Sequence, residues 1–229
     1  MKAVPGRKTD IKDSEWLADL LRHGLLQSSF IPPKPIREFR DLTRYRKSLV
    51  AERTQEVNRL QMLLEGANIK LASVVTDVLG KSGRAMLEAL AAGESDAEEL
   101  AALARGRLRT KIPQLQQALN GLVPPRHRFL VDQILTNIDF LEGAIAYVQQ
   151  EIEQRLRAHQ EEVELLQTIP AVKANAAATI IAEIGTDMSR FPSAKHLASW
   201  AGGCPGNKQS AGKRLKNGIT KGNPYLRAV

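Results

Sequence analysis

Residues 126–167 read RHRFLVDQILTNIDFLEGAIAYVQQEIEQRLRAHQEEVELLQ, and they predict one long helix. The stretch has no proline and only one glycine, Gly143, so nothing in it forces a helix to end. At about 1.5 Å per residue this helix would be roughly 60 Å long. Its aliphatic residues recur mainly at spacings of four and three, which is a heptad-like pattern; they are Ile134, Ile138, Leu141, Ile145, Val148, Ile152, Leu156, Val163 and Leu166.

A second long helix, rich in charged residues, is predicted over residues 36–66. It follows the helix-breaking segment Pro32-Pro33-Lys34-Pro35 and ends at Gly66. Residues 67–123 are punctuated by glycines and predict several short helices. The two long helices therefore predict an antiparallel coiled-coil stalk with a helical tip, paired either within one chain or between two chains.

The two ends of the chain differ from this helical middle. Residues 14–26 predict a short helix capped by Ser14, and the segment GESDAEELAALA predicts another that is capped by Ser95. After Thr168 the composition changes to an Ala- and Ile-rich helix and then to a tail dense in Gly, Asn, Lys and Arg. We therefore predict a mainly α fold in three parts, over residues 1–31, 36–167 and 168–229.

Composition excludes several classes of protein. The chain has 229 residues, and its 43% of hydrophobic residues is ordinary for a soluble globular protein. Cys204 is the single cysteine, so neither a disulfide framework nor a cysteine-based zinc site can form within one chain. No apolar run approaches the roughly 20 residues that cross a bilayer. The first residues, MKAVPGRKTDIKD, do not form a signal peptide, so we expect a cytoplasmic protein with no membrane partner.

The net charge of +8 is concentrated at the two ends of the chain. Residues 1–50 carry +5 and residues 200–229 carry +6, whereas residues 51–199 carry −3. A basic balance of this kind points to a polyanionic partner, most often a nucleic acid, although it also serves solubility alone. The ends are therefore where we expect an anion to bind.

Asp10 and Asp13, in the segment KTDIKD, are the first candidates for chemistry. Two acids at positions i and i+3 of a helix project to the same side. Such oxygen ligands suit Mg²⁺ or Mn²⁺, which orient and activate phosphodiesters. Acids also gather at helix starts because of the helix dipole, and the spacing alone favours this ordinary interpretation.

Ser210 is the second candidate, in the segment NKQSAGKRLKNGITKG. A hydroxyl nucleophile for phosphoryl transfer needs an exposed loop of small residues and cations around the charge that develops on phosphorus. The segment offers both, and its cations are Lys208, Lys213, Arg214, Lys216 and Lys221. The alternative is a loop that contacts phosphate, in which Ser210 only donates a hydrogen bond, and the residues alone favour it.

The segment IPAVKANAAATIIAEIG is the third candidate, because a tight turn before a helix can present backbone N–H groups to a DNA phosphate. In the helix-hairpin-helix form glycines occupy the places held here by Ala171 and Lys173. Lys173 is itself a candidate phosphate contact, as is Arg227 near the end of the sequence. A plain packing element is at least as well supported.

Together these motifs resemble a known family. The segments are GRKTDIKDSEWLADLLRHGLL (6–26), REFRDLTRYRKSLVAERTQEVNRLQMLLEGANIKLASVV (37–75), TIPAVKANAAATIIAEIG (168–185) and SWAGGCPGNKQSAGKRLKNGITKGNPYLRA (199–228). In this order they resemble the DEDD transposases of bacterial insertion sequences, of the insertion-sequence-110 type, also called the 116/902 type.

The resemblance implies an activity and partners. The family combines a RuvC-like, RNase H-type domain that holds four acidic metal ligands, a helical coiled-coil region, and a transposase domain with a catalytic serine. Asp10 and Asp13 match the last two acids, and Ser210 matches the nucleophile. The implied reaction is DNA strand cleavage and rejoining through a phosphoserine link, aided by Mg²⁺ or Mn²⁺. A structured guide RNA is the other partner that the resemblance implies. The coiled-coil pattern of the sequence itself leads us to expect a homo-oligomer formed through the coiled coil.

The sequence departs from the family at both ends. It begins just before KTDIKD, without the two earlier acids, so residues 1–31 match only the C-terminal remnant of the RuvC-like domain. It stops at LRAV, where the family continues. We therefore expect a truncated transposase with weak or no recombinase activity, because two carboxylates without their partners hold a metal weakly.

Two other functions remain open from the sequence. A non-enzymatic nucleic-acid-binding or coiled-coil interaction fragment would bind DNA or RNA in a salt-dependent way without cleaving it. A purely structural coiled coil would have no affinity for nucleic acid even at low salt. Metal-dependent strand cleavage therefore separates the transposase from both.

Overall fold

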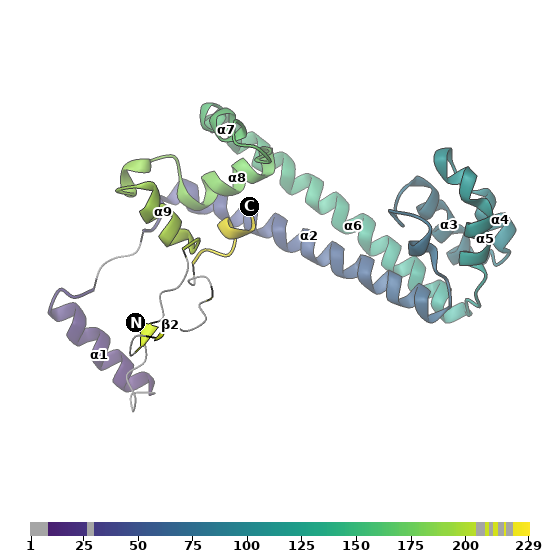
Figure 1. Ribbon diagram of the computed structural model, residues 1–229, viewed down its shortest axis with the longest axis horizontal. Helices are drawn as coiled ribbons and strands as arrows, with labels where there is room; N and C mark the ends of the chain where they lie inside the picture. Colours follow the sequence, from purple (N-terminus) through teal and green to yellow (C-terminus); the bar gives the residue numbers. More distant parts are fainter. Residues whose placement is uncertain (1–8, 27–29, 205–208, 211–212, 215–217, 219–221) are drawn as a thin grey trace.

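The computed structural model describes residues 9–26, 30–204, 209–210, 213–214, 218 and 222–229. The fold is mainly α-helical, which confirms the predicted class, and Figure 1 shows a long two-helix stalk with shorter helices at both ends. The α-helices are α1 (Asp10–Arg22), α2 (Lys34–Gly66), α3 (Lys81–Ala92), α4 (Ala97–Ala102), α5 (Ile112–Leu119), α6 (Pro125–Leu156), α7 (Gln160–Gln167), α8 (Ala174–Ile184) and α9 (Ala194–Ala201). Short 3₁₀ turns and strands join them: η1 (Leu71–Ser73), η2 (Gly106–Lys111), η3 (Arg157–His159), η4 (Met188–Arg190), η5 (Leu226–Ala228), β1 (Gln209–Ser210) and β2 (Lys213–Arg214).

The stalk is formed by α2 and α6, which run side by side in opposite directions within one chain. Both begin with proline in the first turn, where its missing N–H costs nothing. The buried side of α6 carries the aliphatic residues that the sequence predicted, among them Ile138, Leu141 and Ile152. Of the two pairings that the sequence left open, the structure therefore shows the one within a chain.

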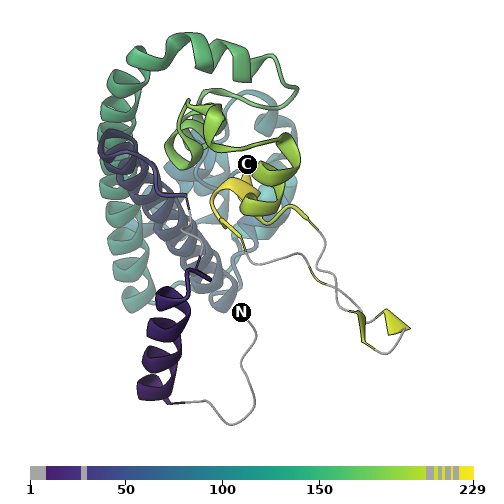
Figure 2. The same cartoon turned by 90° about the vertical axis from the view of Figure 1, so that its left-hand side faces the viewer.

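The prediction of one helix over residues 126–167 is wrong at its end. The helix α6 stops at Leu156, a 3₁₀ turn follows at η3, and α7 then leaves the axis of α6 (Figure 2). This bend lets Val163 of α7 share a core with Ala177 and Ala178 of α8. Burying these side chains together favours the bend, although no proline or glycine marks it.

The tip is a small helical unit built from α3, α4 and α5 around one core, which it shares with the neighbouring ends of α2 and α6. Its largest fully buried side chains include Leu87, Leu100 and Leu115. The helix α4 is capped by Asp96, whose carboxylate accepts from the backbone N–H of Glu98 at 2.8 Å, so the predicted cap at Ser95 is wrong by one residue.

A second core lies at the other end of the stalk and joins α2, α6, α7 and α8. Phe39, Leu49, Ile152 and Ile181 are among its buried members. This core fixes α8 against α2 and thereby places the segment that follows α8.

The helix α1 stands apart from the stalk in both Figure 1 and Figure 2. It begins at Asp10 with Thr9 as its cap, four residues before the start predicted at Ser14, and none of its residues is buried. Its apolar side chains Ile11 and Leu21 are 74% and 68% exposed. No helix of the described part of the chain is both long enough and apolar enough to cross a membrane.

Candidate catalytic serine loop and acidic pair

Ser210 lies in a short antiparallel hairpin between α9 and the last described segment, 222–229. The register pairs Ser210 with Lys213 and Gln209 with Arg214. The hairpin therefore places a cationic residue directly opposite the serine in the ladder. Lys208, Lys216 and Lys221, the other cations predicted for this loop, lie outside the described residues.

The two ends of this loop meet at a closed neck formed by Gly202 and Gly222. A Cβ atom added to Gly222 would lie 2.3 Å from the backbone nitrogen of Gly202 and 2.4 Å from the carbonyl carbon of Ala201. Only glycine allows two backbones to approach so closely. Gly202 itself has a φ of 79° and ends α9 in the left-handed conformation.

Behind the neck, a buried ion pair anchors the returning chain to the stalk. The carboxylate of Glu183, which has no exposed side-chain surface, accepts from Nε and Nη2 of Arg44 at 2.8 and 2.9 Å. Asn223 Nδ2 donates to the same carboxylate at 2.5 Å. Arg40 donates to the carbonyl oxygens of Ala182 and Glu183. One acid of α8 thus binds both α2 and the residue that follows the neck.

The charge of Glu183 is stabilised by these contacts. Burial alone raises the pKa of its carboxyl group, but the hydrogen bonds from Arg44 and Asn223 and the charges of Arg40 and Arg44 outweigh burial, so the pKa lies below its ordinary value. The pKa of Arg44 is raised, chiefly by its hydrogen bond to Glu183. The cluster is therefore ionised at neutral pH.

Tyr225 adds to the anchor, the cluster formed by Glu183, Arg40, Arg44 and Asn223. Its ring lies under the guanidinium of Arg44, with 4.3 Å from Cζ to the ring centroid, and Lys47 Nζ lies 4.9 Å from the same centroid. The side-chain oxygen of Asn223 accepts from the backbone N–H groups of Tyr225 and Leu226. These contacts hold the segment after the neck in a turn against α2.

A hollow of about 270 Å³ opens beside this anchor, between α2, α8 and the segment 225–229. Its polar lining includes Arg46, Lys47, Asn175 and Thr179. The Nε atom of Arg46 is buried and, among the described residues, has no hydrogen-bond partner. The guanidinium of Arg46 and the ammonium of Lys47 line this hollow and make it suited to an anionic group.

The predicted phosphate contacts Lys173 and Arg227 are both exposed. Lys173 occupies the cap position of α8, and Ala171, two residues earlier, has a φ of 71°. This is the left-handed conformation that glycine provides in a helix-hairpin-helix turn. The chain thus makes the tight turn without the glycine.

Asp10 and Asp13 lie in the exposed first turn of α1. Within the described part of the chain, no group of three His, Cys, Asp or Glu side chains is arranged to hold a metal ion. Octahedral Mg²⁺ is usually bound through one or two carboxylates together with waters and substrate phosphates. The pair therefore fits Mg²⁺ as part of a ligand set, with the other ligands still to be supplied.

The anchor residues Glu183, Arg40, Arg44 and Asn223 were missed by sequence reasoning. A signal was present, because Glu183 is the one charged residue in the apolar run AAATIIAEIG. A charge in such a run is rarely buried without a partner. The identity of that partner, 139 residues earlier, was not readable from the pattern.

Comparison with known proteins matches the two ends of the chain. A sequence model described as the transposase IS116/IS110/IS902 family matches residues 163–229, and one of the IS110 DEDD group, described as transposase, matches residues 2–69. The chain is a transposase of the IS110 type. No curated protein and no solved structure matches it.

The two matches divide this IS110-type transposase according to its candidate sites. The first includes α8, the anchor at Glu183 and the Ser210 hairpin, and the second includes Asp10, Asp13 and α2. The ion pair between Arg44 and Glu183 joins the two matched regions. The tip lies almost wholly between them, in residues that neither match covers.

Proposed function

We propose that this transposase binds the DNA of an insertion sequence and cleaves and rejoins its strands with Ser210 as the nucleophile. The observation that carries the proposal is the register of the hairpin, which pairs Ser210 with Lys213 in a loop with a closed neck. Lys213 and Arg214 are the cations that we expect to stabilise negative charge on the phosphate. The Arg46 hollow and the exposed Lys173 support DNA phosphate contacts nearby.

In the proposed step the Oγ atom of Ser210 attacks a DNA phosphorus atom. An Oγ–P bond forms while one P–O bond to the sugar breaks, the serine proton passes to a base, and the leaving sugar oxygen ends as a hydroxyl. A sugar hydroxyl of the strand to be joined then attacks the phosphoserine and releases the serine. Both halves are phosphoryl transfers, so no oxidant or reductant is needed.

Mg²⁺ or Mn²⁺, when bound at Asp10 and Asp13, would supply charge neutralisation and orientation of the phosphate. Because these two carboxylates are exposed and no third ligand is grouped with them among the described residues, we expect weak metal binding by the chain alone. Slow strand cleavage by the isolated chain follows from this.

The surface of the stalk supports a homo-oligomer. Phe129, Phe140 and Tyr147 are 64%, 70% and 77% exposed on α6. Their separations of eleven and seven residues place them on one face of the helix. Exposed aromatic residues aligned along one face of a helix are typical of protein interfaces.

The nucleophile is tested by incubating the full chain with a supercoiled plasmid and MgCl₂ or MnCl₂ and measuring protein–DNA complexes that resist SDS. We expect a slow adduct that Ser210→Ala abolishes. Ser48→Ala is the matched control, since Ser48 is exposed on α2 and its hydroxyl bonds only a carbonyl of its own helix. An adduct that persists in Ser210→Ala would rule out this serine.

A guide RNA is tested in the same assay. The chain is purified with and without ribonuclease treatment, and a nucleic-acid partner that directs cleavage predicts loss of the adduct after treatment. Equal adduct formation by both preparations would count against an RNA requirement.

A second candidate function is a nucleic-acid-binding protein that does not cleave. The observation that favours it is that, in the described residues, no third metal ligand is grouped with Asp10 and Asp13 on α1. This function predicts salt-dependent DNA binding and no adduct for the unsubstituted chain with either metal.

A further inference from the structure

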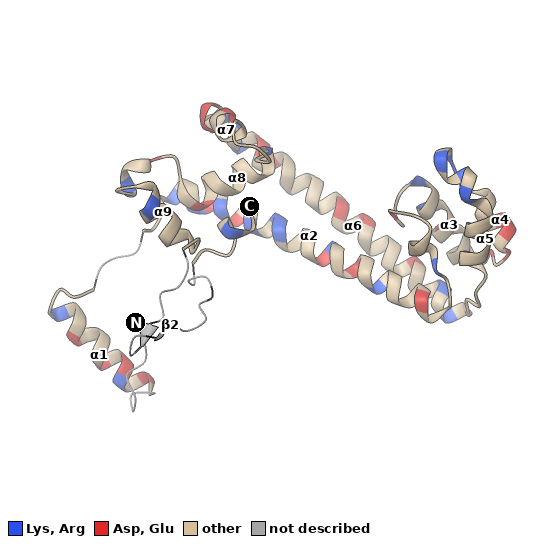
Figure 3. Cartoon of the chain, in the orientation of Figure 1, with Lys and Arg blue, Asp and Glu red and all other residues tan. Residues whose placement is uncertain are grey.

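The tip of the stalk carries a second basic surface. From Arg44, which contacts the segment after the neck of the serine loop, to the end of α2 at Gly66 there are 22 residues, or about 33 Å of helix. A hollow of about 600 Å³ lies between the start of α3 and η2. Lys81 lies on one side, and Arg105, Arg107 and Lys111 lie on the other. All four are exposed, and in Figure 3 the basic residues of η2 gather on one edge of the tip.

These four cations are not paired with acids in the part of the chain that the structure describes. Within the described residues none of them forms an ion pair within 4.0 Å, whereas Arg84, one turn along α3 from Lys81, binds both Asp139 and Glu88. Asp77 is the one acid that lines the hollow, and its Oδ1 accepts from the backbone N–H of Leu79 at 3.0 Å. The hollow therefore keeps an excess of positive charge.

The shape of the hollow is fixed by contacts within the tip. The Oγ atom of Ser82 accepts from the backbone N–H of Arg105 at 2.9 Å, and Lys111 Nζ donates to the carbonyl oxygen of Val74 at 3.1 Å. A Cβ atom added to Gly83 would lie 2.3 Å from the carbonyl oxygen of Val78, so this wall is closely packed. The cations are thus presented from a preformed surface.

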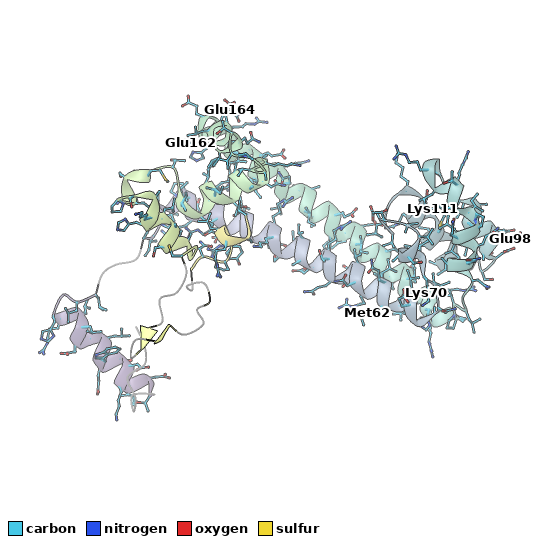
Figure 4. The ribbon with its side chains drawn as sticks, viewed as in Figure 1. Met62, Lys70, Glu98, Lys111, Glu162 and Glu164 are labelled. Atoms are coloured by element: carbon cyan, nitrogen blue, oxygen red, sulfur yellow. The ribbon has the colours of Figure 1, made fainter. Side chains whose placement is uncertain are left out.

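The charge of the tip is also polarised. Apart from Asp77 and Glu88, the acids of this unit lie at α4 and in the residues just before it, and they are Glu94, Asp96, Glu98 and Glu99. Figure 4 shows Glu98 at the outer end of the tip and Lys111 on a different side. A polyanion would be attracted to the η2 side of the tip and repelled from α4. This charge distribution favours binding from the η2 side alone.

We propose that this hollow, lined by Lys81, Arg105, Arg107 and Lys111, binds the sugar–phosphate backbone of a nucleic acid. Unpaired lysine and arginine side chains bind phosphate oxygens and release condensed counterions, whatever the base sequence. At about 3.4 Å per base pair, a duplex that reaches from the tip to the neck of the serine loop must be roughly 10 base pairs long or more. The stalk then holds one nucleic acid at two points.

The test uses the full chain with two labelled probes, a 30-base-pair DNA duplex and an RNA hairpin of similar length. The variant Lys81→Gln/Arg107→Gln removes two cations that make no side-chain contact with an acid. The matched control Arg126→Gln/Arg157→Gln removes the same charge from two exposed positions outside the hollow, neither of which forms an ion pair with another described residue. Melting temperatures confirm that both fold.

We expect the first variant to weaken binding about fivefold to tenfold at low salt and to lower the dependence of log K on log salt by about 1 to 2. The control should change affinity less than twofold. Weakening with only one of the probes identifies DNA or RNA as the occupant. An affinity equal to that of the unsubstituted chain with both probes would overturn the proposal, as would a variant that changes only self-association measured by sedimentation.

The proposal does not depend on the chemistry proposed for Ser210. Ser210→Ala should lose the covalent adduct and keep the binding that depends on Lys81 and Arg107. A chain that binds neither probe contradicts both proposals, whereas a chain that binds both probes equally well without Lys81 and Arg107 contradicts this one alone.

Discussion

Arg44 and Glu183, which lie 139 residues apart in the sequence, form a two-point ion pair that ties α2 to α8. Asn223 shares the carboxylate, so the same acid also holds the chain just after the neck of the serine loop. A change at Glu183 should therefore affect both the stability of the fold and the placement of Ser210.

Glu183→Gln should lower the free energy of unfolding by about 3 kcal/mol, because it leaves Arg40 and Arg44 near a buried site without a counter-charge. Urea denaturation followed by circular dichroism measures this. The control is Glu142→Gln, which breaks an exposed pair with Arg53 and should cost less than about 1 kcal/mol. Equal losses of unfolding free energy in the two variants would mean that the buried pair stabilises the fold no more than the exposed pair does.

The same carboxylate predicts a dependence on pH. Its pKa in the folded chain is lowered, chiefly because the contacts from Arg44 and Asn223 outweigh burial, so the stabilisation is complete above the unfolded value of about 4.3. It is lost as the pH falls below that value and through the folded pKa. The difference in unfolding free energy between the unsubstituted chain and Glu183→Gln should therefore shrink on acidification. A difference that stays constant from pH 7 to pH 3 would contradict the assignment.

Gly222→Ala should disturb the neck of the serine loop, because the new methyl group would collide with the backbone at Ala201 and Gly202. We expect a cost of about 1–3 kcal/mol, typical of overpacking, together with faster proteolysis of the loop and loss of the covalent adduct. Gly218→Ala is the matched control, since a Cβ atom there meets no atom within 4 Å. If Gly218→Ala is as damaging as Gly222→Ala, the neck is not the cause.

The helical stalk was predictable because its signals are local. Apolar spacing marked the buried sides of α2 and α6, and prolines marked where each helix begins. The bend after Leu156 was not predictable, since its cause is the core that Val163 shares with α8. Local pattern shows which side of a helix is buried but not which partner covers it.

Sequence motifs propose the residues of the candidate site, but they do not reveal the contacts that hold the surrounding chain in place. Ser210, Asp10 and Asp13 were identified through motifs. The closed neck depends on two glycines that are 20 residues apart, and the anchor depends on an ion pair across the fold. Such contacts leave no periodic trace in the sequence.

Ala171→Gly should stabilise the turn before α8. Ala171 has a φ of 71°, and the left-handed region costs a residue with a side chain about 1 kcal/mol or more. After the greater freedom of glycine in the unfolded chain is subtracted, we expect a gain of about 0.5 kcal/mol in thermal or urea unfolding. Ala51→Gly, at an exposed position within α2, should instead lose about 1 kcal/mol. A loss in Ala171→Gly as large as that in Ala51→Gly would show that the turn is not strained.

The aromatic face of α6 predicts a self-association that can be removed without unfolding. Phe140→Ala/Tyr147→Ala deletes two exposed rings, so the fold should keep its melting temperature within a few degrees. Because aromatic side chains dominate the energy of protein interfaces, the dissociation constant of the oligomer should rise at least about tenfold. Sedimentation equilibrium over a range of protein concentrations measures this change. Met62→Ala, on α2, serves as the control because Met62 is 75% exposed and lies on the other helix of the stalk. An oligomer that survives loss of the rings but dissociates in Met62→Ala would move the interface from α6 to α2.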